Sequence, residues 1–197
     1  GLGSVGSLLA QTASVLGMKI IGYDPYISVD AAWMLPKEVE KAEELNHLLS
    51  NSDYISLHIP LTDKTKNFIS KKNLNAFKPG SKLINLSRGG IVNNEDILEA
   101  LQQRKVSNFV TDFPTKELIE RSVTKKDVIL LPHLGASTKE AEINCAVMAS
   151  EQVKKFLSDG VIINSINFPK VSLGRTTKYR MVIIHKDEPG VIGMLAG

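Results

Sequence analysis

The sequence predicts an α/β protein: a doubly wound parallel sheet that lacks its first strand, followed by the start of a smaller α+β domain. A glycine-rich turn opens the 197-residue chain, and strand-like apolar runs then alternate with helical patterns. A new strand-turn-helix pattern begins nineteen residues before the end. Because successive parallel strands need a crossover connection, this alternation predicts helices on both faces of the sheet.

The opening turn reads G-x-G-x-x-G, with Gly1, Gly3 and Gly6 at its fixed positions. A helical pattern follows, residues 18–23 read as a strand, and Asp24 stands at its end, 18 residues beyond Gly6. In the Rossmann-like fold, such glycines let helix N-terminal amides approach a pyrophosphate, and an acid at about this distance binds the ribose hydroxyls. We therefore predict a dinucleotide site; a plain strand-to-helix turn is the alternative.

The following elements continue the alternation. We expect helices over residues 38–49, 71–77 and 94–103, strands over 54–59, 82–86, 107–112 and 127–131, and then a long helix over 138–157 capped by Ser137 or Thr138. After a linker, residues 179–185 alternate like a strand, and a turn at 187–190 leads into a helix over 191–195.

These patterns divide the chain into a truncated nucleotide-binding domain (1–137), a long helix (138–158), a linker (159–178) and the truncated start of a second domain (179–197). A glycine turn without a preceding strand has nothing to pack on. We therefore expect the chain to be a piece of a longer protein. The resemblance described below implies that the longer protein also has a substrate domain and that the piece alone does not catalyse.

The composition is that of an ordinary globular protein, with 43% hydrophobic and 23% charged residues. The net charge of +3, with both signs interspersed, is too small to indicate a nucleic-acid partner. No apolar run approaches the ~20 residues of a membrane helix. The single cysteine, Cys145, excludes an internal disulfide, and the four histidines lie in separate segments, so we predict no metal site.

Polar side chains follow several predicted strands at their carboxyl ends, which meet at the ligand-binding edge of an open α/β sheet. The planar guanidinium of Arg88 suits a carboxylate, although a surface arginine on helix-end carbonyls is the alternative. His133 follows Pro132 at a strand end, where it is either an acid/base or a structural histidine. The residues around Glu117 by themselves favour a solvated acid in a loop or at a helix start.

The chain carries five motifs in a fixed order: Gly1-Leu2-Gly3-Ser4-Val5-Gly6, Tyr23-Asp24-Pro25, His58-Ile59-Pro60-Leu61-Thr62, Asn85-Leu86-Ser87-Arg88-Gly89-Gly90 and Pro132-His133-Leu134-Gly135-Ala136-Ser137-Thr138. This combination closely resembles the D-isomer-specific 2-hydroxyacid dehydrogenases. The resemblance extends over nearly the whole chain. It implies hydride transfer between a 2-hydroxy acid and NAD.

The resemblance also implies a catalytic set. Arg88 matches the arginine that binds the substrate carboxylate, His133 the acid/base, and Glu117 the glutamate that hydrogen-bonds the other imidazole nitrogen. The family pattern Asp-Val-Phe-x-x-Glu-Pro is altered here, because Phe113 follows Asp112 directly and the final proline is absent. Counting from Phe113 would put a lysine at the glutamate position; we prefer Glu117, since a lysine would oppose imidazolium formation.

For the cofactor, the resemblance assigns residues by position. Those at the pyrophosphate are Gly1, Gly3, Ser4, Val5 and Gly6; Asp24 takes the ribose, and Ile59 and Pro60 lie on the adenosine side. Those around the nicotinamide are Leu86, Ser87, Arg88, Asp112, His133, Gly135 and Ala136, with Asp112 on the carboxamide. The acid at Asp24 also implies a preference for NAD over NADP.

Within the family, residues 133–138 and the domain that begins near Tyr179 point to members that oxidise 3-phosphoglycerate in serine biosynthesis. Residues 179–197 resemble the start of an ACT-type regulatory domain, which implies an amino-acid effector. The resemblance further implies a cytoplasmic homodimer or homotetramer, with no nucleic-acid or membrane partner. A sister reductase of glyoxylate or hydroxypyruvate, and a non-enzymatic NAD-sensing corepressor relative, are the alternatives.

Overall fold

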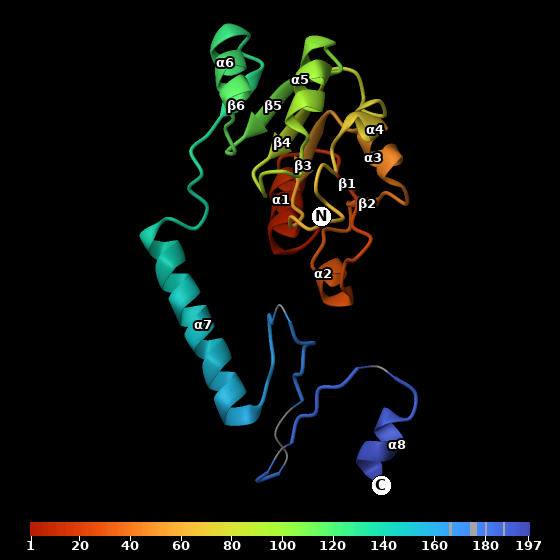
Figure 1. The fold of residues 1–197 in the computed structure, drawn as a ribbon, viewed down its shortest axis with the longest axis vertical. Helices are drawn as coiled ribbons and strands as arrows, with labels where there is room; N and C mark the ends of the chain where they lie inside the picture. Colours follow the sequence, from red (N-terminus) through yellow and green to blue (C-terminus); the bar gives the residue numbers. More distant parts are fainter. Residues whose placement is uncertain (166, 174–176, 180, 187) are drawn as a thin grey trace. The chain divides into compact units, whose positions relative to one another are not determined.

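The computed structural model describes residues 1–165, 167–173, 177–179, 181–186 and 188–197. The chain forms two compact units, Gly1–His133 and Leu134–Gly197, and each is described by itself. The first holds all of the strands and six of the helices in the described residues (Figure 1).

The core of the first unit is a four-stranded sheet with the order β3-β4-β5-β6. Its strands are β3 (Tyr54–Leu57), β4 (Ser81–Asn85), β5 (Val106–Thr111) and β6 (Val128–Leu130). All three pairings are parallel, as the alternation predicted. Leu83, Val106 and Phe109 are fully buried within it, so the central strands are apolar because helices cover them.

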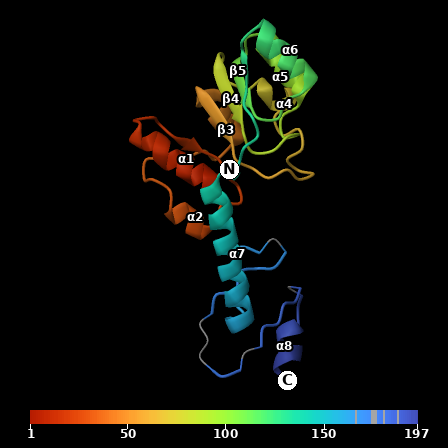
Figure 2. The same cartoon turned by 90° about the vertical axis from the view of Figure 1, so that its left-hand side faces the viewer.

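Helices pack on both faces of this sheet. Figure 2 shows α1 (Ser4–Val15) on one side of the strands and α4 (Lys71–Leu74), α5 (Asn94–Gln102) and α6 (Lys116–Thr124) on the other. Leu118 of α6 and Ile97 of α5 are buried in the core. The predicted parallel α/β architecture is therefore confirmed for this unit.

A second, smaller sheet pairs β1 (Ile21–Gly22) with β2 (Glu40–Lys41) in parallel. The predicted strand over 18–23 thus shortens to two residues, and the predicted helix over 38–49 is wrong in its first half. The amide of Glu40 donates to Ile20 O and that of Ala42 donates to Gly22 O, both at 2.9 Å. Pairing with a distant strand satisfies these backbone groups, and helix α3 (Leu45–Asn51) begins only afterwards.

Two helices appear where the sequence predicted none. Helix α2 (Val29–Trp33) is capped by the Ser28 side chain, and α6 by that of Thr115. Helix α2 has no buried residue and α6 buries only Leu118. Helix α2 is also only five residues long, too short for a hydrophobic period to predict it.

In the second unit, α7 (Lys139–Asp159) confirms the predicted long helix. Thr138 caps its start by accepting a hydrogen bond from the Ala141 amide, and Gly160 ends it at a φ of +63°. Glycine suits this left-handed position because it has no Cβ. No helix in the described residues is long and apolar enough to cross a membrane.

The predicted strand over 179–185 does not form in the part that is described, since residues 181–186 have no strand assignment. A strand needs a neighbour to take its backbone hydrogen bonds. Arg180 of this strand, residues 166 and 174–176 of the predicted linker, and Asp187 of the predicted turn lie outside the described residues. Helix α8 (Val191–Ala196) forms as expected, while the ACT-type domain stays a prediction.

Candidate dinucleotide and acid-base site

The glycine turn packs closely against Tyr23, after β1, and against His58, after β3. The amino group of Gly1 donates to Tyr23 O at 3.0 Å. A Cβ on Gly1 would collide with the carbonyl oxygen of His58, and a Cβ on Gly6 would collide with that of Gly1. Only glycine therefore allows this close approach of backbone to backbone at Gly1 and Gly6.

The N-terminus of α1 is open to a ligand. Gly3 is its N-cap residue and supplies no side-chain cap, and a Cβ there would meet nothing within 4 Å. Ser4 and Val5, in the first turn, are exposed. The first amides of a helix lack intrahelical partners and attract anions, so this end of α1 suits a pyrophosphate.

Asp24 is fixed next to this turn. Its Oδ2 accepts from the Leu2 amide at 2.8 Å, and its Oδ1 accepts from the Tyr26 amide at 2.9 Å. A carboxylate has about four acceptor positions, so each oxygen retains capacity for a ribose hydroxyl. Ile59 and Pro60 follow β3 on the other side of the turn, and Ile59 packs against the core.

The loop after β4 is built around Asn85, a polar residue buried at the end of an apolar strand. Its side-chain Nδ2 donates to Arg88 O at 3.0 Å, while its Oδ1 accepts from the Ser87 hydroxyl at 2.9 Å. The Arg88 guanidinium is exposed and donates to Ser87 O at 2.6 Å. Leu86 is exposed in the same loop. Sequence reasoning gave Asn85 no role, although a buried polar residue at a strand end is a recognisable signal.

Asp112, directly after β5, and His133, after the neighbouring strand β6, lie together. Asp112 Oδ2 lies 2.8 Å from His133 Nδ1. The Asp112 side chain is 9% exposed and that of His133 is 53% exposed. The Phe113 ring packs against the imidazole, with 5.0 Å between the ring centroids. Asp112 Oδ1 is buried and has no hydrogen-bond partner among the described residues.

Glu117 is not hydrogen-bonded to His133 in this structure, and its pairing with the imidazole stays a prediction. Within the described part of the chain, Glu117 makes no hydrogen bond to the imidazole; it lies exposed in the first turn of α6. Hydrogen bonds from its own backbone amide and from the Thr115 hydroxyl, together with the charge of Lys116, lower the pKa of Glu117. A helix N-terminus favours a negative charge, which explains why the side chain stays there.

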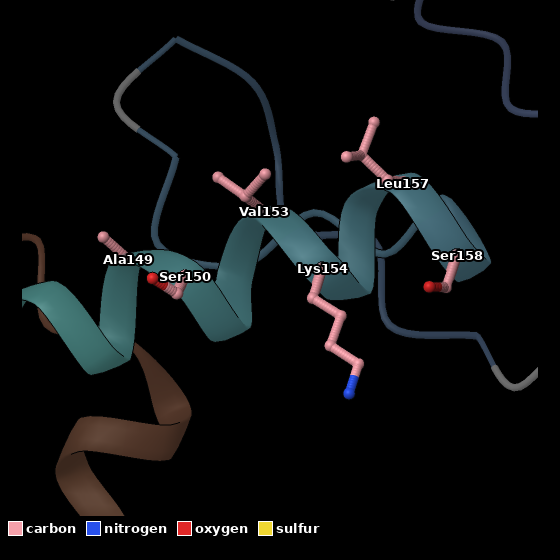
Figure 3. Close-up of a pocket in the computed structure, with 6 residues that line it drawn as sticks. All are labelled: Ala149, Ser150, Val153, Lys154, Leu157 and Ser158. Carbon is pink, nitrogen blue, oxygen red and sulfur yellow. The ribbon is translucent and has the colours of Figure 1, made fainter.

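A pocket of about 340 Å³ joins the two loops, because Asn85 and Gly89 line it together with Asp112 and Phe113. The predicted nicotinamide residues Gly135 and Ala136 belong to the second unit. That unit has a hollow of its own, where Ala149, Val153 and Leu157 line up along one side of α7 (Figure 3). None of the predicted site residues lines this second hollow.

Comparison with known proteins identifies the family. Residues 1–135 match the model of the "D-isomer specific 2-hydroxyacid dehydrogenase, NAD binding domain". The chain belongs to this family. Its NAD-binding domain therefore contains the glycine turn, Asp24 and the Asp112–His133 pair.

Curated relatives and solved structures agree with this membership. The chain is 36% identical over 200 residues to a D-3-phosphoglycerate dehydrogenase of Synechocystis, and 32% identical over 202 residues to that of Escherichia coli. These alignments cover 100% and 99% of this chain but only 36% and 48% of the relatives. The chain thus spans less than half of their length.

Among solved structures, D-lactate dehydrogenase from Lactobacillus jensenii with NAD⁺ is similar, with a TM-score of 0.67 and 26% identity over 88% of this chain and 54% of that chain. The apo D-lactate dehydrogenase of E. coli also has a TM-score of 0.67 and 26% identity, over 81% of this chain and 50% of that chain. The family and these likenesses establish NAD as the cofactor of this domain.

Proposed function

We propose that this 2-hydroxyacid dehydrogenase oxidises 3-phosphoglycerate to 3-phosphohydroxypyruvate with NAD, the first step of serine biosynthesis. The names of the curated relatives, at 32% to 36% identity, support this substrate. The observation that carries the chemistry is the Asp112–His133 pair, since it presents a half-exposed imidazole beside a carboxylate in the NAD-binding domain.

The residues present fit NAD. The uncapped start of α1, with Gly1, Gly3, Ser4, Val5 and Gly6, suits the pyrophosphate, and Asp24 suits the ribose hydroxyls. Asp112 Oδ1, buried without a partner in the described residues, suits the donor NH₂ of a carboxamide. We assign Ile59 and Pro60 to the adenosine side, and Leu86, Ser87, Gly135 and Ala136 to the nicotinamide side. Bound NAD supplies the acceptor for the hydride from C2.

The chain's own residues position the substrate and move the proton. The exposed Arg88 guanidinium binds the substrate carboxylate, because its planar fork matches two carboxylate oxygens. Neutral His133 accepts the C2 hydroxyl proton at Nε2 as the hydride leaves C2, and returns it in the reverse direction. Glu117 is assigned, by resemblance, to supporting the protonated imidazole in the complete enzyme.

A substrate panel on the intact protein tests this function. With NADH, 3-phosphohydroxypyruvate should have a higher kcat/KM than glyoxylate, hydroxypyruvate or pyruvate. The His133→Ala variant should lose turnover by about 10³-fold, while its Kd for NADH stays within about twofold. A preference for an unphosphorylated 2-keto acid would instead assign the protein to a sister reductase, for which the likeness to D-lactate dehydrogenases argues.

No turnover with any of these acids, despite tight NADH binding, would favour the corepressor-like alternative. We also propose an ACT-type regulatory domain that starts near residue 179, an amino-acid effector bound there, and assembly into a dimer or tetramer in the cytoplasm. Light scattering with and without serine tests the assembly and the effector together.

A further inference from the structure

We propose that Phe113 is a positioning residue for the reaction: its ring packs against both the loop of Arg88 and the imidazole of His133, and so sets the spacing between these two side chains. This inference rests on the proposed function, because it requires Arg88 and His133 to act on one substrate. It leaves the predicted pairing of His133 with Glu117 unchanged. Phe113 is also where the chain departs from the family pattern, since the aromatic residue follows Asp112 directly.

The ring of Phe113 has two neighbours that belong to different loops of the site. Its centroid lies 5.0 Å from that of the His133 imidazole, with 47° between the two planes. The same ring lies so close to Gly89, the residue after Arg88, that a Cβ on Gly89 would come within 3.3 Å of Phe113 Cδ1. Glycine at position 89 therefore lets the ring pack directly against the backbone beside Arg88.

Phe113 itself is held in place by its backbone. Its amide donates to the hydroxyl of Thr111, which is 1% exposed, at 3.2 Å. Pro114 follows, and the residue before a proline is restricted to extended conformations. Thr115 then caps α6, whose Leu118 is fully buried. Because an aromatic side chain also has few rotatable bonds, the ring acts as a rigid spacer.

The loop beside the ring is fixed as well. Asn85 Nδ2 donates to Arg88 O at 3.0 Å, and Gly90 O accepts from the Asn67 amide at 2.8 Å. The backbone on both sides of Gly89 is therefore held. The imidazole, by contrast, is 53% exposed, so a contact with a rigid ring limits the positions that it can take.

The proposed reaction requires a defined spacing between its two groups. Arg88 binds the substrate carboxylate, and the carbon next to that carboxylate bears the hydroxyl whose proton goes to His133. An acid/base must come within about 2.6–3.2 Å of the atom whose proton it takes. A displacement of about 1 Å can cost 10²-fold in rate. A ring that packs against the loop of one group and the side chain of the other therefore affects the chemical step.

The first test is the ring-current shift of the His133 imidazole C–H protons, measured by NMR on the intact protein without cofactor. The His133→Gln variant assigns the signals. Phe113→Leu should move them because the ring is lost, whereas Phe113→Tyr retains a ring and should leave them near their wild-type positions. His58, which lies against Ser56, reports a general rearrangement, and its signals should not move. Unmoved His133 signals in Phe113→Leu would overturn the proposal.

The second test is the steady-state rate of the intact protein with NADH and the 2-keto acid that the wild type reduces best. Phe113→Leu should lower kcat by at least about tenfold, because His133 is displaced. Its KM should stay within about threefold, since Arg88 still binds the carboxylate. Phe113→Tyr should restore kcat to within about threefold of the wild type. A wild-type kcat in Phe113→Leu, or a change in KM alone, would contradict the positioning role.

Gly89→Ala gives an independent test that keeps the ring, and it serves even if Phe113→Leu does not fold. Its methyl group would press on the Phe113 ring, so the His133 signals should move and kcat should fall by about fivefold. In the Phe113→Leu background the same change should have less than about a twofold effect on kcat, because a flexible leucine can move aside. A wild-type kcat in Gly89→Ala, or an equal loss in both backgrounds, would overturn the proposal. The NMR measurements need no turnover, so they fail separately from the proposed function.

Discussion

At the scale of single residues, the glycine turn before α1 depends on positions that have no side chain. Gly6 is buried against the Gly1 carbonyl, whereas Gly3 at the helix start faces open space. The two glycines of one motif therefore do different work. Gly6 allows the turn to close, and Gly3 leaves the helix amides accessible.

Gly6→Ala should lower the free energy of unfolding by about 3 kcal/mol, at the upper end of overpacking costs, because the added methyl meets backbone atoms that cannot rotate away. Gly3→Ala is the matched control and should cost less than about 1 kcal/mol, since its backbone φ of −68° suits alanine. Urea denaturation of the two variants checks this. Equal losses at both positions would contradict the account of the turn.

His58 provides a pH-dependent prediction. Its Nε2 lies 2.9 Å from the Ser56 hydroxyl, and burial lowers the pKa of His58 below 6.5. The folded state therefore binds this proton less readily than the unfolded state. Above pH 6.5 His58 is neutral in both states and does not reduce the free energy of unfolding. As the pH falls from 6.5 to the folded-state pKa, the unfolded state takes up the proton first, and the free energy of unfolding decreases.

The His58→Gln variant should reduce the drop in unfolding free energy between pH 8 and pH 5, because glutamine does not titrate. Denaturant titrations at both pH values give the comparison, and the pH 8 value shows the cost of the substitution itself. If the unfolding free energy of the variant decreases as much as that of the wild type between pH 8 and pH 5, His58 does not cause the loss of stability in acid.

At the scale of elements, α6 is held by side chains at both of its ends. Thr115 caps the helix, which leaves Glu117 in the exposed first turn. At its other end, Arg121 forms a bidentate pair with Asp127, the residue before β6, at 2.9 and 2.7 Å. Both ends of α6 are thus tied down by polar side chains.

Arg121→Ala should therefore destabilise the domain by about 2–3 kcal/mol, since Asp127 would lose its partner in a mostly buried place. The side chains of the pair are only 16% and 22% exposed. Lys41→Ala, which removes the 76% exposed partner of Glu43, is the control and should cost under about 1 kcal/mol. Thermal unfolding of both variants is the measurement; similar losses would mean that α6 is held by its apolar contacts instead.

At the scale of the whole molecule, the first unit brings the proposed cofactor residues together from separate elements, and the second unit contains α7 and α8. The loop of Gly1 to Gly6, the end of β1 with Asp24 and the start of α1 meet at one place. We expect the preference for NAD over NADP to depend on these segments together. No single element contains both the residues proposed for the pyrophosphate and the residue proposed for the ribose.

We expect the intact protein to use NADH in preference to NADPH, because the Asp24 carboxylate would repel a 2′-phosphate. Asp24→Asn retains an acceptor for the Leu2 amide while removing the charge. It should improve the NADPH to NADH ratio of kcat/KM by about tenfold, the effect of ~1.4 kcal/mol. Steady-state rates with both cofactors decide this, and comparable efficiency in the wild type would refute the role of Asp24.

The sequence by itself determined the parallel α/β architecture, the glycine turn with its acid, and the strand-end residues, because hydrophobic period and strand-end position are local properties. Only the tertiary structure decided that residues 40–41 form a strand with β1, that Asn85 organises the Arg88 loop, and that Asp112 bonds to His133. The bond between Asp112 and His133 joins groups 21 residues apart. Such pairings depend on which strands lie side by side in the sheet and on which hydrogen-bonding groups then lack a partner. No local sequence pattern carries that information.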